Sequence, residues 1–186
     1  MSSVVPDSFL NLSSSLISLS LQNCNLRGKF PETIFHLPNL EELDLGQNTN
    51  LTGSTPKSNW SSPLNSLQLS STKISIDLHF LTSNLKSLRV LFLRECNFPG
   101  SHLEFSGNLT QLRQLDLAGN SFRGQIPWWS LLNLERLFSL DLSNNMFVGE
   151  LPEIHSNSTK TSSSLHDSSK KQLVGSVPRG LNKLSL

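Results

Sequence analysis

The sequence has few charged residues, and neither sign of charge is in clear excess. Only 16% of its 186 residues are Asp, Glu, Lys or Arg, and the formal net charge is +1. A nucleic-acid-binding domain would carry clustered Lys and Arg, so the composition argues against a nucleic-acid partner. The chain has no apolar run near the roughly 20 residues that a membrane-spanning helix needs. Residues 1–6 also lack the basic start and apolar stretch of a signal peptide. We therefore expect any membrane attachment to come through segments outside this sequence.

Cysteine is scarce as well, because Cys24 and Cys96 are the only two in the chain. This number predicts no disulfide framework. The two residues hold the same position in repeats that lie three apart, so stacked strands would separate them by roughly 14 Å. A disulfide needs Cα atoms within about 7 Å, which excludes this pairing in a stacked fold. We predict two buried free thiols, and no metal site, because no His or Cys partner stands at a useful spacing.

Leucine, in contrast, recurs in a fixed pattern. Residues 16–145 contain six copies of the spacing LxxLxLxxN, and all eighteen leucine positions of these copies hold leucine. The repeats begin with Leu16, Leu40, Leu64, Leu88, Leu112 and Leu137. Their last position holds Cys24, Asn48, Thr72, Cys96, Asn120 and Asn145. Successive repeats are 24 residues apart, with a single step of 25 before Asn145.

This spacing predicts a stack of short strands. Alternating leucines such as Leu43 and Leu45 place every second side chain on one face of a strand. One repeat cannot bury its leucines alone, so neighbouring repeats must stack into a continuous core with a parallel sheet. The asparagine that ends the pattern can bond backbone groups that the turn leaves unpaired. We predict an α/β-type repeat solenoid with a concave parallel β-sheet and irregular convex turns.

A second signature, LxGxIP, follows the strand in several repeats. It covers Leu26 to Pro31, Phe122 to Pro127 and Phe147 to Pro152, and it is shifted by one residue at Leu51 to Pro56. Glycine permits backbone angles closed to other residues, and proline fixes φ and removes a donor, so together they set the outer turn. Repeats three and four break the signature, with Ile76, Leu78 and His79 in one and His102-Leu103 in the other. We expect irregular outer turns in these two repeats.

The combined pattern LxxLxLxxNxLxGxIP resembles the plant-specific class of leucine-rich repeats. The resemblance covers about residues 5–155, and residues 39–61 are most similar to receptor-like proteins of the disease-resistance type. It implies a leucine-rich-repeat horseshoe that recognises a protein or peptide ligand, and could engage a co-receptor ectodomain, on the extracellular side of the plasma membrane. It also implies a role in pathogen perception and defence signalling. Two alternatives stay open, a secreted polygalacturonase-inhibitor-like protein and a truncated gene product without function.

The repeat frame divides the chain into four parts. Val5-Pro6 fits the end of an outer signature, so we interpret residues 1–15 as a partial repeat and the chain as a fragment of an ectodomain. Residues 16–155 hold the six repeats. Residues 156–171 form a degenerate Ser- and Lys-rich segment that we expect to be a loop. Residues 172–186 form a partial seventh repeat, with Leu173 as the first residue of an outer signature.

The concave face is the expected ligand-binding surface. Its outward positions hold mainly Ser, Asp and Gln, but repeat four departs from this background with an aromatic residue beside an arginine. Interface hot spots favour aromatic residues and Arg, so repeat four is predicted to anchor a ligand; neutral drift on a solvated face is the alternative. The candidate ligand-binding residues are Phe92, Arg94, Glu95, Val90, Gln68 and Asp116.

Five N-x-[ST] sequons are candidate glycosylation sites. They lie at Asn11, Asn50, Asn59, Asn108 and Asn157. All five fall off the predicted concave strands, where a glycan would leave the binding face free. Chance occurrence in a chain rich in Ser and Asn is the alternative interpretation.

Neither the histidines nor the tryptophans indicate a catalytic site. The five histidines fall in different turns and form no ligand set or triad, and the chain has no nucleophile elbow. Trp128 and Trp129 follow Pro127 on an outer turn, where one is expected to pack inward and the other to be exposed. We predict a binding protein rather than an enzyme, with no cofactor.

Overall fold

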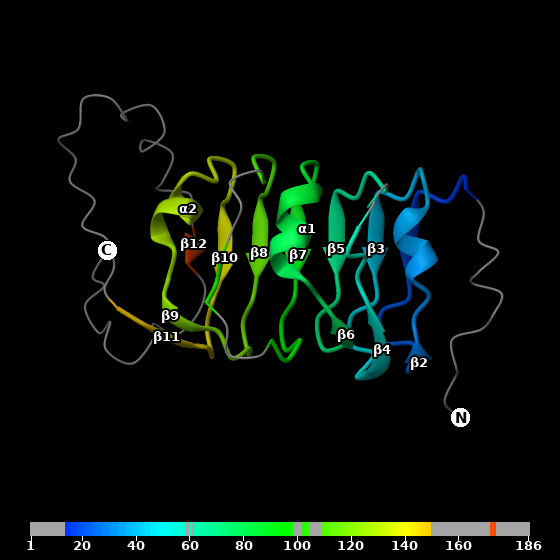
Figure 1. The fold of residues 1–186 in the computed structure, drawn as a ribbon, viewed down its shortest axis with the longest axis horizontal. Helices are drawn as coiled ribbons and strands as arrows, with labels where there is room; N and C mark the ends of the chain where they lie inside the picture. Colours follow the sequence, from blue (N-terminus) through cyan, green and yellow to red (C-terminus); the bar gives the residue numbers. More distant parts are fainter. Residues whose placement is uncertain are drawn as a thin grey trace.

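The computed structural model describes residues 14–58, 60, 62–98, 102–104, 109–149 and 172–173. Within these residues, one seven-stranded parallel sheet takes one strand from each repeat, in chain order. Figure 1 shows these strands in a row along the long axis of the molecule. Their bounds are β1 (Ser18–Ser20), β3 (Glu42–Asp44), β5 (Ser66–Gln68), β7 (Val90–Phe92), β8 (Gln114–Asp116), β10 (Ser139–Asp141) and β12 (Gln172–Leu173). The predicted parallel sheet of a repeat solenoid is confirmed.

The register of this sheet aligns the central leucine of each strand with that of the next. Leu43 pairs with Leu67, and Leu67 pairs with Leu91. All three side chains have no exposed area. The predicted leucine ladder is therefore the core of the molecule, as a continuous cluster that runs through all six repeats.

The turn asparagines connect consecutive repeats by hydrogen bonds. Asn48 is fully buried, and its Nδ2 donates to the carbonyl oxygens of Leu45 in its own repeat and Leu21 in the preceding one. Its Oδ1 accepts from the backbone N–H of Leu26. Asn120 forms the corresponding set of bonds between its own repeat and repeat four. The amide thus satisfies backbone groups that would be buried without a partner, as the pattern predicts.

The outer signature forms short strands in addition to the predicted turns. β2 (Arg27–Lys29), β4 (Asn50–Ser54) and β6 (Lys73–Ser75) build a second parallel sheet. β9 (Arg123–Gln125) and β11 (Met146–Val148) build a third. These strands lie along the lower edge of the view in Figure 1. None of the described residues of repeat four lies in an outer strand.

Among the described residues, short helices lie on the outer side of the solenoid, namely η2 (Glu32–His36), α1 (Leu78–Asn84) and α2 (Trp128–Leu132). The irregular outer turn predicted for repeat three is wrong, because this repeat forms α1. Asp77 begins the helix by accepting a hydrogen bond from the Phe80 N–H, and Leu78 and Leu81 are buried beneath it. In repeat four the described residues include His102, which forms an isolated parallel bridge with Arg123. None of the described helices is long and apolar enough to span a membrane.

The seventh repeat is placed differently from the prediction. Leu173 lies in β12 opposite Leu140, on the inner sheet, rather than in an outer signature. The predicted frame placed His166 and Ser168 at the inner strand positions. Leu173 instead pairs with Leu140, later in the chain than the 24- or 25-residue period would place it.

The two cysteines are both free, but only one is buried. Cys96 occupies the asparagine position as predicted, and its Sγ donates to the carbonyl oxygen of Leu69 in the preceding repeat. Cys24 is exposed, so the prediction of two buried thiols is wrong for this residue. The Sγ of Cys24 donates to the carbonyl oxygen of Gln22, within its own repeat, at 3.5 Å.

Candidate ligand-binding surface

Strand β7 carries the centre of the candidate surface. Val90 and Phe92 flank the fully buried Leu91, so their side chains point away from the core, on the concave face of the inner sheet, and are half-buried. The register places Gln68 on one side of Phe92 and Asp116 on the other. The predicted alternation is confirmed, and an aromatic ring lies between two polar residues on a rigid sheet.

Arg94 follows β7 and bridges three repeats by ion pairs. Its Nε donates to Oδ2 of Asp116 at 2.9 Å. Its Nη2 donates to Oδ2 of Asp141, two repeats away. The backbone N–H of Arg94 donates to Oγ of Ser70 at 3.1 Å, which joins repeat three to the same network. The arginine predicted as a ligand contact is thus already bonded to the protein.

The ion pairs change the acid–base properties of this cluster. Burial by itself lowers the pKa of Arg94, but the charges and hydrogen bonds of Asp116 and Asp141 outweigh it and raise the pKa above its ordinary value. Burial by itself raises the pKa of Asp141, but hydrogen bonds from Ser143 and the contact with Arg94 outweigh it and lower that pKa. Both groups are therefore charged at neutral pH.

Glu95 lies in the turn that follows the strand rather than on the strand itself. Its backbone has a φ of 54°, in the left-handed region. The same turn position has a positive φ in the other repeats, at Asn23, Gln47, Ser71, Gly119 and Asn144. A Cβ added at Gly119 would approach Cγ of Glu95 to 2.8 Å, so the Glu95 side chain lies over that glycine. Its Oε2 accepts a hydrogen bond from Ser71 Oγ at 3.0 Å.

Three carboxylates gather in repeat two, and we call Glu41, Glu42 and Asp44 the acidic patch. Glu42 is the first residue of strand β3 and Asp44 is the last, and Glu41 directly precedes the strand. Each carboxylate accepts one hydrogen bond from a neutral group, but none of the three forms an ion pair within the described part of the chain. Gln68 lies beside Asp44 in the register and connects the acidic patch to Phe92.

Sequence reasoning missed Asp141 as a partner of Arg94. Asp116 and Asp141 hold equivalent strand positions in successive repeats, and each Oδ1 accepts the backbone N–H two residues later. This local bond fixes the carboxylate, so the second oxygen of both residues points to the same guanidinium. The repeat period aligns both aspartates with Phe92 and places Ala118 and Ser143 at the position of Arg94, so spacing alone did not indicate the two ion pairs.

The remaining predicted residues are only partly described. Asn50 is exposed on β4, off the inner sheet, and its Oδ1 accepts from Nζ of Lys73 at 3.5 Å. The other four sequon residues, Asn11, Asn59, Asn108 and Asn157, lie outside the described residues. Trp128 packs against the core while Trp129 is 76% exposed, as predicted. The described residues include no group of three or more His, Cys, Asp or Glu that could hold a metal ion.

Comparison with known proteins identifies related sequences. The model of the family described as Leucine Rich Repeat matches residues 15–37, 111–132 and 136–158. Receptor-like protein 34 of Arabidopsis thaliana is 39% identical over 124 residues, which are 66% of this chain and 12% of that protein. Receptor-like protein 9DC1 of Solanum pimpinellifolium is 37% identical over 102 residues, 54% of this chain and 12% of that protein. The chain thus spans about an eighth of the length of these relatives.

Solved structures support the same fold. A crystal structure of a TDR receptor matches with a TM-score of 0.64 and 32% identity, over 75% of this chain and 24% of that one. The Arabidopsis receptor kinase HAESA, in complex with the peptide hormone IDA and the co-receptor SERK1, matches with a TM-score of 0.60 and 34% identity, over 73% of this chain and 23% of that one. Both are receptors whose matched regions are repeat solenoids of this kind.

Proposed function

Because the chain belongs to the plant leucine-rich-repeat receptor-like proteins, we propose that its concave sheet recognises a peptide or protein ligand and performs no catalysis. The observation that carries the proposal is Phe92, a half-buried aromatic side chain on the concave face of a rigid sheet. An aromatic residue held in this way loses little conformational entropy on binding. Such residues are frequent among interface hot spots.

The ligand that fits this surface is a peptide with an apolar and a basic side chain. Arg94 is neutralised by Asp116 and Asp141, which leaves it little capacity to bind an acidic partner. The acidic patch has no cationic partner among the described residues, so it is complementary to Lys or Arg. We therefore expect the apolar side chain to contact Phe92 and the basic one to lie over repeat two.

A peptide selection tests the proposal. Random twelve-residue peptides displayed on phage would be selected on the immobilised chain, and the binders measured against Phe92→Ala. Removal of a hot-spot side chain costs at least about 2 kcal/mol, or roughly thirtyfold in affinity. We expect this loss for the selected peptides, together with an enrichment of Lys or Arg.

Trp129→Ala is the matched control. Trp129 is the more exposed aromatic side chain and lies on α2, away from the inner sheet. Its removal should leave the affinity within about twofold if the concave sheet is the binding surface. Binders that depend on Trp129 and tolerate Phe92→Ala would contradict the proposal.

The same proposal extends to the protein that contains this chain. We place its repeats on the extracellular side of the plasma membrane, with a co-receptor ectodomain as a second partner. Support comes from the receptor-like proteins that match the chain and from the co-receptor present with HAESA. The resemblance of residues 39–61 to receptors of the disease-resistance type supports a role in pathogen perception.

Glycosylation at Asn50 is compatible with this function. The side chain is exposed on β4, in the second sheet, where a glycan would not cover the concave face. Expression through a plant secretory pathway should yield a peptide containing Asn50 that loses glycan mass on treatment with a peptide N-glycosidase. Asn50→Gln should remove that mass, and an unmodified Asn50 peptide in the parent would contradict the assignment.

A further inference from the structure

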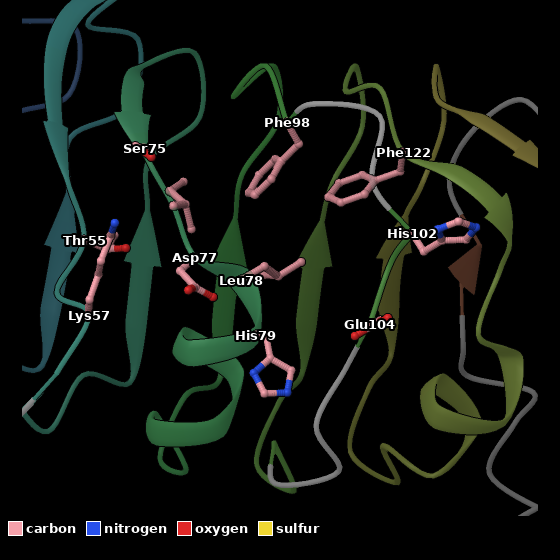
Figure 2. Close-up of a pocket in the computed structure, with 11 residues that line it drawn as sticks. Thr55, Lys57, Ser75, Asp77, Leu78, His79, Phe98, His102, Glu104 and Phe122 are labelled. Atoms are coloured by element: carbon pink, nitrogen blue, oxygen red, sulfur yellow. The ribbon is translucent and has the colours of Figure 1, made fainter.

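A cavity of about 590 Å³ on the outer side of the solenoid is lined by charged groups of both signs. Figure 2 shows Lys57 at one end, Glu104 at the other and Asp77 between them. Thr55 lines the cavity too, but its unpaired hydroxyl is buried and out of reach of a ligand. The cavity therefore favours no ligand of one charge. Two positive charges lie side by side elsewhere, at the edge of the inner sheet.

One residue of each repeat belongs to a row along this edge, directly before the inner strand. From the second repeat on, its backbone N–H donates to the carbonyl oxygen of the row residue one repeat earlier, at 2.7–3.0 Å. The six residues, which we call the edge row, are Ile17, Glu41, Asn65, Arg89, Arg113 and Phe138. Nδ2 of Asn65 donates to Oε2 of Glu41 at 2.9 Å, so neighbouring side chains of the edge row reach each other. The edge row shares Glu41 with the acidic patch.

Arg89 and Arg113 are neighbours in the edge row, and we call them the arginine pair. Both side chains are exposed, and neither forms an ion pair or a side-chain hydrogen bond within the described part of the chain. The aspartates of strands β8 and β10 are bonded to Arg94 instead. Like charges on adjacent strands repel each other. An anion bound between the two guanidinium groups would remove this repulsion and accept charge-assisted hydrogen bonds from both.

An exposed aromatic side chain borders the arginine pair. Phe138 follows Arg113 in the edge row and is 44% exposed. A bare inorganic anion gains nothing from an apolar neighbour, whereas a peptide carries apolar groups next to its carboxylates. Interface hot spots are also rich in Arg and aromatic residues. The occupant that fits the arginine pair is therefore a carboxylate of a peptide.

We propose that the arginine pair binds a carboxylate of the peptide ligand, while a basic side chain of the same peptide lies at the acidic patch. This inference rests on the proposed function, because it assumes a peptide on the inner sheet. With strands about 4.8 Å apart, Glu41 is roughly 10 Å from Arg89 and roughly 14 Å from Arg113. An extended peptide advances about 3.3–3.6 Å per residue. The basic and acidic residues of the ligand are therefore about three or four positions apart.

Parallel selections test this spacing. The library of displayed twelve-residue peptides would be selected on the parent chain and on the double variant Arg89→Gln/Arg113→Gln. Peptides selected on the parent should be enriched in Asp or Glu about three or four positions from Lys or Arg. Selection on the double variant should lose the enrichment of the acidic residue and keep that of the basic one. Equal frequencies of the acidic residue in both selections would overturn the proposal.

Affinities of the peptides selected on the parent test the contact itself. Arg89→Gln/Arg113→Gln should weaken them at least about tenfold, because it removes two charge-assisted hydrogen bonds. Arg27→Gln/Arg123→Gln is the matched control, since it removes the same charge from exposed arginines of the outer strands β2 and β9. The control should stay within about twofold of the parent. An equal loss in both double variants would show that binding follows overall charge alone, and would reject the site.

Two sets of synthetic peptides identify the group that is bound. Replacing the acidic residue by Gln should cost as much affinity as the arginine double variant, and replacing it by Lys should restore binding to Arg89→Glu/Arg113→Glu. Peptides shortened to end at that Gln, as free acid and as amide, separate a side-chain carboxylate from a terminal one. Recovery by the free acid alone would assign the terminal group. Full affinity of the uncut Gln peptide for the parent would contradict a carboxylate site.

The variants also separate this inference from the proposed function. A loss of affinity with Phe92→Ala but not with Arg89→Gln/Arg113→Gln would reject the arginine pair and leave the concave sheet as the recognition surface. A loss with the arginine double variant but not with Phe92→Ala would support the arginine pair and contradict the role given to Phe92.

Discussion

At the residue scale, Thr55 and Thr72 show how much one buried hydroxyl contributes to the free energy of unfolding. Both side chains are 2% exposed, and they differ in whether the hydroxyl is bonded. Thr72→Val removes a hydrogen bond and should lower the free energy of unfolding by about 1 kcal/mol. Thr55→Val removes an unpaired group and should leave that free energy unchanged or raise it by up to about 1 kcal/mol.

Urea titration of the two variants and the parent gives these values directly. The parent must be measured without added ligand, since any occupant of the cavity would stabilise it. Equal losses of about 1 kcal/mol in both variants would contradict the account of Thr55, because they would show that its hydroxyl is bonded in the folded protein.

The two thiols provide a second test at this scale. Cys96 is buried, and burial raises the pKa of its thiol to about 12, so it has little reactive thiolate at neutral pH. Cys24 is exposed. Iodoacetamide at about pH 8 should therefore add one group to the folded protein, at Cys24, and two after denaturation, as read by mass spectrometry. Two adducts on the folded protein would show that the stack around Cys96 opens readily.

At this scale the sequence predicted the hydrogen-bonding role of a side chain better than its exposure to solvent. It predicted that Asn48 would bond backbone groups and that Cys96 would fill the same position, because both follow from the repeat register. It could not predict that Cys24 is exposed, since exposure depends on the packing around a residue and not on its position in the pattern alone. Thr55 gave no signal either, because its missing partner is apparent only from the contacts around it.

At the scale of strands, Arg94 connects repeats that already share a sheet. The lowered pKa of Asp141 means that its contribution to stability is present above the ordinary carboxyl pKa of 3.8 and is lost as pH falls through the lower folded-state pKa. Asp141→Asn should therefore be less stable than the parent at pH 7, by about 0.5–1 kcal/mol for a pair that is partly exposed to solvent. The difference should shrink as pH falls below about 4.

Asp44→Asn is the matched control for this prediction. Asp44 occupies the equivalent strand position and forms the same bond to the backbone N–H two residues later, but it makes no ion pair among the described residues. Thermal or urea unfolding of both variants between about pH 2.5 and 7 measures the effect. A pH dependence of Asp141→Asn that matches that of Asp44→Asn would show that Arg94 contributes nothing to it.

The secondary-structure elements were predictable where the repeat dictates them. The inner strands follow from alternating leucines, and six of the seven lie where the period places them. Helix α1 was missed because its signal is local: Asp77 caps a helix in a repeat whose outer signature is absent. Strand β12 was misplaced because it pairs with β10 at a spacing longer than the 24- or 25-residue period on which the prediction rested.

At the scale of the whole molecule, the candidate sites lie on two different faces of the solenoid. The concave sheet presents Phe92 and the acidic patch, and the outer side carries the cavity, the helices and Asn50. The position of the concave surface was predictable from the sequence, but the state of Arg94 was not, because it depends on side chains from three repeats.

A glycan placed on the concave face tests the central claim most directly. The double substitution Ser66→Asn and Gln68→Thr creates a sequon whose asparagine lies on β5, next to Val90 of β7. After expression in a secretory host, with occupancy confirmed by mass, the account predicts at least about thirtyfold weaker binding of the selected peptides. Enzymatic removal of the glycan should restore binding, and Asn50→Gln, which changes only the outer side, should leave it within about twofold. Unchanged affinity with the glycan in place on β5 would contradict the claim that the concave sheet is the recognition surface.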